Sequence, residues 1–260
     1  MGRIREKFNQ LKKQGKKAFI PYLTFGFPDI KTSESLIVAM SSAGADFIEV
    51  GIPFSDPIAD GPIIQHSSNT ALQKGANLQK LFLSLKKIKP QVKCPLIVMS
   101  YSNPIYHTGV KKFFNRISGL VDGIIVSDML VEESKEFVNT AWSHRLDTIF
   151  FISPTTQPGR LKLIDSRSSG FVYYISVTGV TGPRKEFSRD ISRNLRAIKG
   201  KIKNPLCLGF GVSNQKSARK IKKDCDGIIV GSAIIKKIDQ LKEEKNLLQK
   251  IKHYTLWLNG

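Results

Sequence analysis

The sequence predicts an α/β fold, a single (β/α)8 TIM barrel with an extra N-terminal helix. Short apolar runs rich in β-branched residues alternate with longer amphipathic segments along the whole chain, which is typical of a parallel sheet covered by helices. Eight such units fit into 260 residues, close to the roughly 250 of this barrel. No change of composition and no Pro/Ser-rich linker divides the chain, so residues 1–260 are expected to form one domain.

The predicted strands are short, as strands buried on both faces usually are. They are Ala18–Leu23, Phe47–Gly51, Leu96–Ser100, Gly123–Val126, Thr148–Ile152, Phe171–Ser176, Leu206–Gly209 and Gly227–Val230. A doubly wound sheet would more often carry five or six strands. The number of βα units therefore favours a closed barrel.

A predicted amphipathic helix follows each strand. Examples are Lys31–Ala43, Leu78–Ile88, Glu132–Trp142, Ser188–Lys199 and Asn214–Lys223. Asp29 is expected to cap the first of them, and Ser213 or Asn214 the last, because their side-chain oxygens can accept from free backbone N–H groups. A further amphipathic segment, Ile4–Lys13, precedes the first strand and is expected to cap the barrel bottom.

Cysteine and histidine usage argues against a metal or disulfide framework. The three cysteines, Cys94, Cys207 and Cys225, are scattered, and the four histidines show no ligand spacing. No apolar run approaches the roughly 18 residues that span a membrane. The apolar stretch after the basic N-terminus is interrupted by Pro21 and Pro28, which argues against a signal peptide. We therefore expect a cytoplasmic protein without a metal site.

The chain is strongly basic, with 41 Lys and Arg against 21 Asp and Glu and a net charge of +20. Such a charge suggests nucleic-acid binding. However, the basic residues spread from Arg3 to Lys252, mostly on predicted outer helices, and no helix-turn-helix or zinc-finger spacing occurs. Solvated helix faces are the favoured interpretation, and we expect no nucleic-acid partner. The excess charge can still attract an anionic substrate.

Three glycine-bearing segments follow the last three predicted strands. They are residues 178–182, 209–213 and 231–233. Glycine lets the backbone approach an anion closely, and a helix N-terminus offers free N–H groups. Because the active site of this barrel lies at the carboxyl ends of its strands, three such segments in register predict a phosphate site. No G-x-G-x-x-G follows the first strand, so a dinucleotide site is not expected.

Two carboxylates stand out around the second predicted strand. Glu49 lies between Ile48 and Val50, so it points into the barrel if these neighbours face the helices. An acid in an apolar interior has a raised pKa, which suits proton transfer near neutral pH. The alternative is a structural Glu49 bonded to a backbone donor or a lysine. On the following loop, Asp60 and Asp56 both remain candidates, because loop aspartates commonly form turns.

Residues 49–62, with the sequence Glu-Val-Gly-Ile-Pro-Phe-Ser-Asp-Pro-Ile-Ala-Asp-Gly-Pro, resemble the signature of the tryptophan synthase alpha chain family. The likeness continues in order across nearly the full length, at residues 19–24, 101–105, 177–182, 209–213 and 231–234. It implies retro-aldol cleavage of indole-3-glycerol phosphate. Glu49 would move a proton at indole C3, and Asp60 would accept a hydrogen bond from the indole N–H. No cofactor and no metal is implied.

The resemblance also implies the remaining site residues. The phosphate site corresponds to Gly182, Gly211, Gly231 and Ser232, and the indole pocket to Tyr22, Tyr101, Ile152 and Tyr173. Thr181 corresponds to a mobile loop whose closure orders Asp60. The loop facing a β subunit corresponds to Phe54, Ser55, Asp56 and Pro57, and Asp128 to a residue that relays closure. The implied assembly is an α2β2 heterotetramer that passes indole to the β subunit for L-tryptophan biosynthesis.

Two departures from the family pattern concern loop closure. Residues 127–130 lack the proline-rich version common after the fourth strand, and Pro183-Arg184 replaces small or acidic residues. Neither removes a catalytic carboxylate. Three alternatives to a lyase subunit stay open: a free-standing lyase, an inactive chain that only activates the β subunit, and a nucleic-acid-binding barrel.

Overall fold

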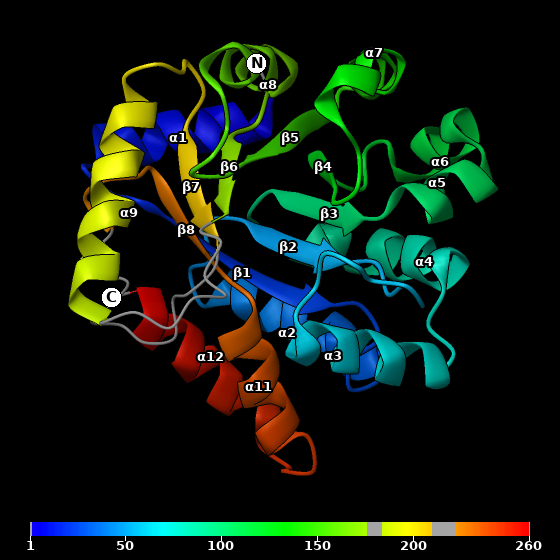
Figure 1. Ribbon diagram of the computed structural model, residues 1–260. Coiled ribbons are helices and arrows are strands. Elements are labelled where there is room, and N and C mark those ends of the chain that lie inside the picture. The colour runs from blue at the N-terminus through cyan, green and yellow to red at the C-terminus, as the bar shows by residue number, and fades with distance from the viewer. Residues whose placement is uncertain (1, 176–183, 210–221, 260) are drawn as a thin grey trace.

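The computed structural model describes residues 2–175, 184–209 and 222–259, without the side chains of residues 184–189. Parallel strands form a closed barrel in sequence order, which confirms the predicted fold class (Figure 1). They are β1 (Ala18–Thr24), β2 (Ile48–Gly51), β3 (Leu96–Ser100), β4 (Gly123–Val126), β5 (Asp147–Ile152), β6 (Val172–Ile175), β7 (Leu206–Gly209) and β8 (Gly227–Val230). Pairing of β1 with β8 closes the barrel, with Phe19 opposite Ile228.

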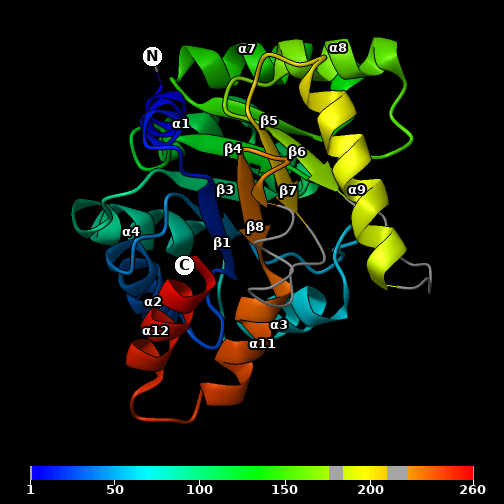
Figure 2. The same ribbon diagram turned by 90° about the vertical axis from the view of Figure 1, so that its left-hand side faces the viewer.

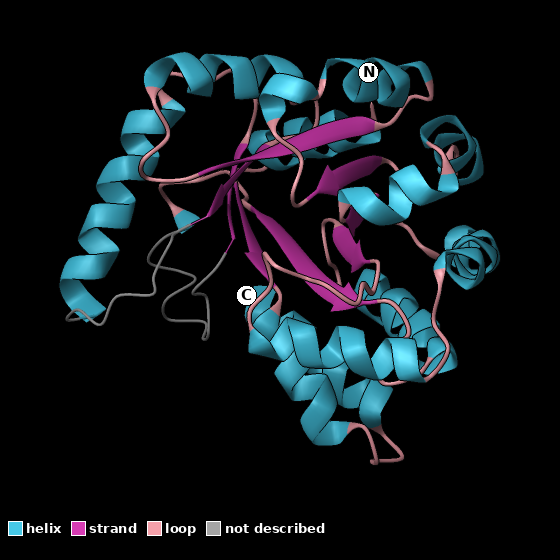
Figure 3. Ribbon diagram, turned by 45° about the vertical axis from the view of Figure 1, so that its right-hand side comes forward, coloured by secondary structure: helices cyan, strands magenta, loops and turns pink. Residues whose placement is uncertain are grey.

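Helices surround the strands on the outside (Figure 3). They are α1 (Arg3–Lys13), α2 (Ile30–Ser42), α3 (Pro62–Gln73), α4 (Leu78–Ile88), α5 (Ser102–Thr108), α6 (Val110–Ile117), α7 (Lys135–Ser143), α8 (Pro158–Arg167), α9 (Arg184–Lys199), α11 (Ser232–Leu241) and α12 (Leu247–Asn259). The predicted cap Asp29 accepts a hydrogen bond from the Thr32 N–H at 2.8 Å. The predicted caps Ser213 and Asn214, and nearly all of their helix, lie outside the described residues.

The predicted helix Glu132–Trp142 is divided in the structure. A 3-10 turn, η2 (Val131–Glu133), precedes α7. Ser134 lies between them, and its hydroxyl donates to the Val131 carbonyl at 2.7 Å. A serine that bonds to the nearby backbone competes with regular helix, so the apolar periodicity alone overestimated the length of this helix.

Apolar residues pack in two layers that follow the alternation of the strands. Ile48 and Val50 belong to the cluster between strands and helices, while Phe47 belongs to the cluster inside the barrel. Helix α1 closes the inner cluster from below with Ile4, Phe8 and Leu11. The Phe8 and Phe47 rings stack at 4.8 Å.

Burial of each large apolar side chain of α1 under the barrel stabilises the fold by about 1.5–3 kcal/mol. Figure 2 shows α1 at the end of the barrel opposite α3 and α11. The predicted N-terminal cap is thus confirmed.

A repeated polar contact fixes the strand starts at this lower end. A side chain in the turn before each even-numbered strand accepts a hydrogen bond from a backbone N–H at the start of the preceding strand. The pairs are Phe19 with Asp46 (3.0 Å), Leu96 with Asp122 (2.9 Å), Thr148 with Ser169 (3.1 Å) and Leu206 with Asp226 (3.0 Å). Three of the four acceptors are aspartates, and each of these pairs with lysine or arginine. Part of the positive charge therefore balances structural carboxylates.

We expect Asp122→Ala to destabilise the fold by about 2–3 kcal/mol, because the Leu96 N–H and two cations lose their acceptor. The control is Asp190→Ala, which removes an exposed pair with Arg193 and should cost less than about 0.5 kcal/mol. Urea unfolding of both variants measures the difference. Equal stabilities would contradict a structural role for this contact.

Candidate active site

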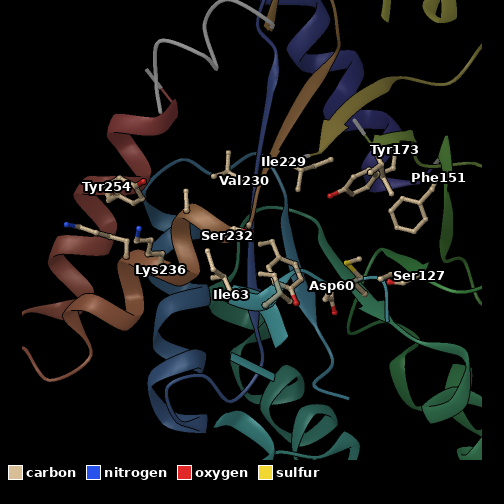
Figure 4. A pocket seen from close by; sticks show the side chains of 18 of the residues that line it. Asp60, Ile63, Ser127, Phe151, Tyr173, Ile229, Val230, Ser232, Lys236 and Tyr254 are labelled. Carbon is tan, nitrogen blue, oxygen red and sulfur yellow. The ribbon is translucent and has the colours of Figure 1, made fainter. Parts of the chain in front are cut away.

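A cavity of about 580 Å³ opens at the carboxyl ends of the strands. Its walls combine aromatic, aliphatic and polar side chains, among them Tyr22, Asp60, Phe151, Tyr173, Ile229 and Ser232. Figure 4 shows Phe151 and Tyr173 on one side of this cavity, and Lys236 and Tyr254 on the other. Its place agrees with the rule that such barrels carry their active sites on this face.

Glu49 points into the barrel from β2, although it is not among the residues that line this cavity. Its side chain is fully buried, and neither carboxylate oxygen has a hydrogen-bond partner within the described part of the chain. It lies in register with Tyr22, which lines the cavity. Burial raises the pKa of the Glu49 carboxyl to about 8. The side chain is therefore mostly protonated at neutral pH and can both give and take a proton there.

The pKa of Glu49 couples its protonation to folding. Because the pKa is raised from 4.5 in the unfolded chain to about 8, the folded chain keeps a proton that the unfolded chain has lost. The contribution of protonated Glu49 to the free energy of unfolding is thus fully present below pH 4.5, the unfolded pKa, and it is lost as the pH rises toward 8. Between pH 5 and 7 this loss amounts to about 2–3 kcal/mol.

We therefore expect Glu49→Gln to stabilise the chain more at pH 7 than at pH 5, since glutamine cannot ionise. The exposed Glu243→Gln variant serves as the control. Its free energy of unfolding should differ from that of the wild type by the same amount at both pH values. Urea unfolding at the two pH values measures both. A pH-independent effect of Glu49→Gln would show that Glu49 does not hold its proton in the folded chain.

Asp60, on the loop between β2 and α3, lines the cavity. The Tyr101 hydroxyl donates to its carboxylate at 3.0 Å and accepts from the Ala59 N–H at 3.0 Å. Burial raises the pKa of Asp60, and the bond from Tyr101 opposes this shift. Asp56 is exposed and accepts from the Ser55 hydroxyl instead. Of the two candidate aspartates, only Asp60 is placed at the cavity.

Two glycines at strand ends make room for the cavity tyrosines. A Cβ atom on Gly51 would lie 2.1 Å from the Tyr22 hydroxyl, and one on Gly209 would lie 2.0 Å from the Tyr173 ring. Burial, followed by the charges of Asp60 and Glu49, raises the pKa of Tyr22. Tyr22 therefore stays protonated and presents a neutral hydroxyl close to both carboxylates.

Two of the four predicted pocket residues, Ile152 and Tyr101, are not among the residues that line the cavity. Ile152 does not line the cavity but packs in the cluster between strands and helices, whereas Phe151 lines the cavity. In β5 the inward positions are those of Ile149 and Phe151. The alternation within this strand was the signal that could have identified Phe151. Tyr101 stands behind Asp60 rather than in the cavity wall.

The predicted phosphate site is only partly described. Gly231 and Ser232 line the cavity, and α11 begins at Ser232, so its free backbone N–H groups lie at the cavity. Thr181, Gly182 and Gly211 lie outside the described residues.

The segments after β2, β3 and β4 contact one another through hydrogen bonds and a pair of aromatic rings. Besides the bond from Tyr101 to Asp60, the Ser102 N–H donates to Asp128 at 2.7 Å, and the Phe54 and Tyr101 rings lie 5.4 Å apart. Ser55 is exposed like Asp56, and Pro57 is half-buried. The predicted partner-facing residues therefore form one connected edge beside the cavity.

The described residues include neither a candidate membrane span nor a candidate metal site. No helix there is long and apolar enough to cross a membrane. No group of three or more His, Cys, Asp or Glu side chains there could hold a metal ion.

Fold and site together define an α/β-barrel enzyme with one buried carboxylic acid inside the barrel and a second, half-buried one at its mouth. The model of the tryptophan synthase alpha chain family matches residues 8–257. The chain belongs to this family. It is 39% identical over 246 residues to the tryptophan synthase alpha chain of Geotalea uraniireducens, covering 94% of this chain and 92% of the relative. It is also 39% identical over 259 residues to that of Caldanaerobacter subterraneus, covering 99% and 98%.

Solved structures show the same likeness. Tryptophan synthase subunit alpha from Legionella pneumophila superimposes with a TM-score of 0.93 at 30% identity, covering 100% of this chain and 97% of that one. A chain of tryptophan synthase from M. tuberculosis superimposes with a TM-score of 0.87 at 29% identity, covering 100% and 98%.

Proposed function

We propose that the chain is a carbon–carbon lyase that cleaves indole-3-glycerol phosphate to indole and glyceraldehyde 3-phosphate. The observation that carries this proposal is a fully buried carboxyl, Glu49, with no hydrogen-bond partner among the described residues and a raised pKa, in register with Tyr22 of the cavity wall. A second carboxyl, Asp60, lines the same cavity. Paired acids in different environments suit a reaction that needs both a proton donor and a charge-stabilising group.

The proposed reaction is a retro-aldol cleavage in two steps. Protonated Glu49 gives its proton to indole C3, and the ring becomes positively charged. Asp60 accepts a hydrogen bond from the indole N–H and stabilises this charge. The Glu49 carboxylate then takes the proton of the C3′ hydroxyl as the C3–C3′ bond breaks. The bonding electrons return to the ring, which yields indole and the aldehyde and restores protonated Glu49.

The substrate fits the two ends of the cavity. Apolar and aromatic side chains such as Phe151 and Ile229 suit the indole ring. The start of α11, with Gly231 and Ser232, suits the phosphate. We include Gly182, Gly211 and Thr181 in the proposed site on the family resemblance alone. The scheme requires no cofactor.

The direct test is release of indole from indole-3-glycerol phosphate by the purified chain. Indole formed in step with glyceraldehyde 3-phosphate supports the proposal. A chain that binds the substrate without any turnover, alone or with a β subunit, would instead support the inactive activator.

We further propose that the chain works with a tryptophan synthase β subunit in an α2β2 complex in the cytoplasm. Large apolar side chains are exposed on the connections after β2, β3 and β4: Ile58 at 81%, Tyr106 at 58% and Leu130 at 52%. Ile58 and Leu130 lie on the same connections as the predicted interface residues Phe54–Pro57 and Asp128, and Tyr106 lies on the connection between them. Exposed apolar groups of this kind mark protein–protein contacts. Cys94, Cys207 and Cys225 are buried, which suits thiols in a reducing compartment.

We expect Ile58→Asp to weaken binding of the β subunit by about 10- to 100-fold, because a charge would replace an apolar side chain that the partner covers in the complex. Leu248→Asp, on the exposed side of α12, is the control and should leave binding unchanged. Titration calorimetry with the purified β subunit measures both affinities. If neither variant nor the wild type associates while turnover is high, the free-standing lyase is the better interpretation.

A further inference from the structure

Helix α11 presents one polar face to the cavity. The residues of this face follow helical spacing: Ser232, Ala233, Lys236, Lys237 and Gln240. The other face is buried among apolar side chains: Ile234, Ile235, Ile238 and Leu241. The helix cannot turn the two lysines away from the cavity without exposing this apolar face.

The charges of Lys236 and Lys237 are not neutralised by any described residue, since neither side chain has a hydrogen bond or ion pair there. By contrast, Lys242 at the far end of the same helix pairs with Asp239 at 3.0 Å. The two adjacent lysines repel each other, and the positive end of the helix dipole adds to their field. Within the described residues, this wall of the cavity therefore carries a positive potential that no acidic partner offsets.

The cavity is thus electrically polarised. Figure 4 shows Ser232 between Lys236 on one side and Asp60 with Tyr173 on the other. Lys236 lies on one side of the helix start, together with Tyr254, while Asp60, Phe151 and Tyr173 lie on the other side. A ligand with a dianionic end and an aromatic end that develops positive charge is oriented by such a field.

We infer that Lys236 and Lys237 determine specificity for the phosphorylated substrate by attracting its phosphate through space toward Gly231 and Ser232. This inference rests on the proposed function for the identity of the substrate. The lysines accelerate capture and orient the substrate, whereas proton transfer is left to Glu49. Because the Debye length is about 10 Å at 0.1 M salt, their effect must decrease as salt rises.

The test compares three double variants over a range of salt concentrations. Lys236→Gln with Lys237→Gln should lower kcat/KM for indole-3-glycerol phosphate about tenfold at low salt and less than about twofold at about 0.5 M, with kcat unchanged. The corresponding Lys→Arg pair should restore kcat/KM. Lys12→Gln with Lys13→Gln removes the same charge from adjacent exposed lysines of α1, at the opposite end of the barrel, and should have little effect.

Binding measurements separate this inference from the proposed function. Calorimetry with inorganic phosphate and with glycerol 3-phosphate should show weaker binding to the Lys→Gln pair, and indole should bind unchanged. If the wild type cleaves no substrate but binds phosphate in this lysine-dependent way, the proposed reaction fails and the inference stands. The inference is overturned if the Lys12/Lys13 control loses as much phosphate affinity as the Lys236/Lys237 glutamine pair. It is also overturned if the arginine pair does not restore phosphate affinity.

Discussion

Glu49→Gln is expected to lower kcat for indole release by about 10²–10⁴-fold while changing KM by less than about threefold. The substitution keeps the size of a side chain that is fully buried and removes only its ability to transfer a proton. Since burial keeps the carboxyl mostly neutral at pH 7, glutamine replaces a neutral group and the fold should persist. The loss should therefore appear in the chemical step and not in binding.

Steady-state kinetics and a binding measurement with the intact substrate separate the two effects. Glu243→Gln, an exposed change of the same kind, controls for the loss of a carboxyl group. If Glu49→Gln keeps more than about a tenth of wild-type turnover, Glu49 is not the proton-transfer group. The structural interpretation of this buried acid would then be the better one.

Asp60→Asn is expected to lower kcat by about 10²–10³-fold, the loss typical of removing one charge-stabilising group from a transition state. Asparagine preserves the shape and can still accept from the Tyr101 hydroxyl, but it brings no negative charge to the indole ring. Asp56→Asn is the matched control on the same loop, four residues away and exposed. It should leave the turnover of the isolated chain unchanged.

This pair of variants decides between the two aspartates that the loop sequence alone left open. Turnover should be measured on the isolated chain, so that an effect of Asp56→Asn on partner binding cannot change the measured rate. A large loss with Asp56→Asn and none with Asp60→Asn would reverse the assignment. Equal losses would indicate that the loop is needed as a whole.

Much of the fold could be predicted because strand alternation and helix periodicity are local properties. The apolar run around Glu49 predicted both the strand and the inward direction of the carboxyl, and the structure places it there. The amphipathic segment before the first strand predicted the cap under the barrel. By contrast, the break at Ser134 depends on one side chain bonding to the backbone, which apolar periodicity does not record.

The sequence by itself determined the barrel, the inward acid on β2 and the helix start after β8, because each follows from residues close together in the chain. Only the tertiary structure decided which loop aspartate reaches the cavity, since Asp60 is held by Tyr101, 41 residues away. It also decided that Lys236 and Lys237 lie in the wall of the same cavity as Asp60 and Tyr173. These facts depend on how distant segments meet at one end of a closed barrel, and no local pattern specifies that meeting.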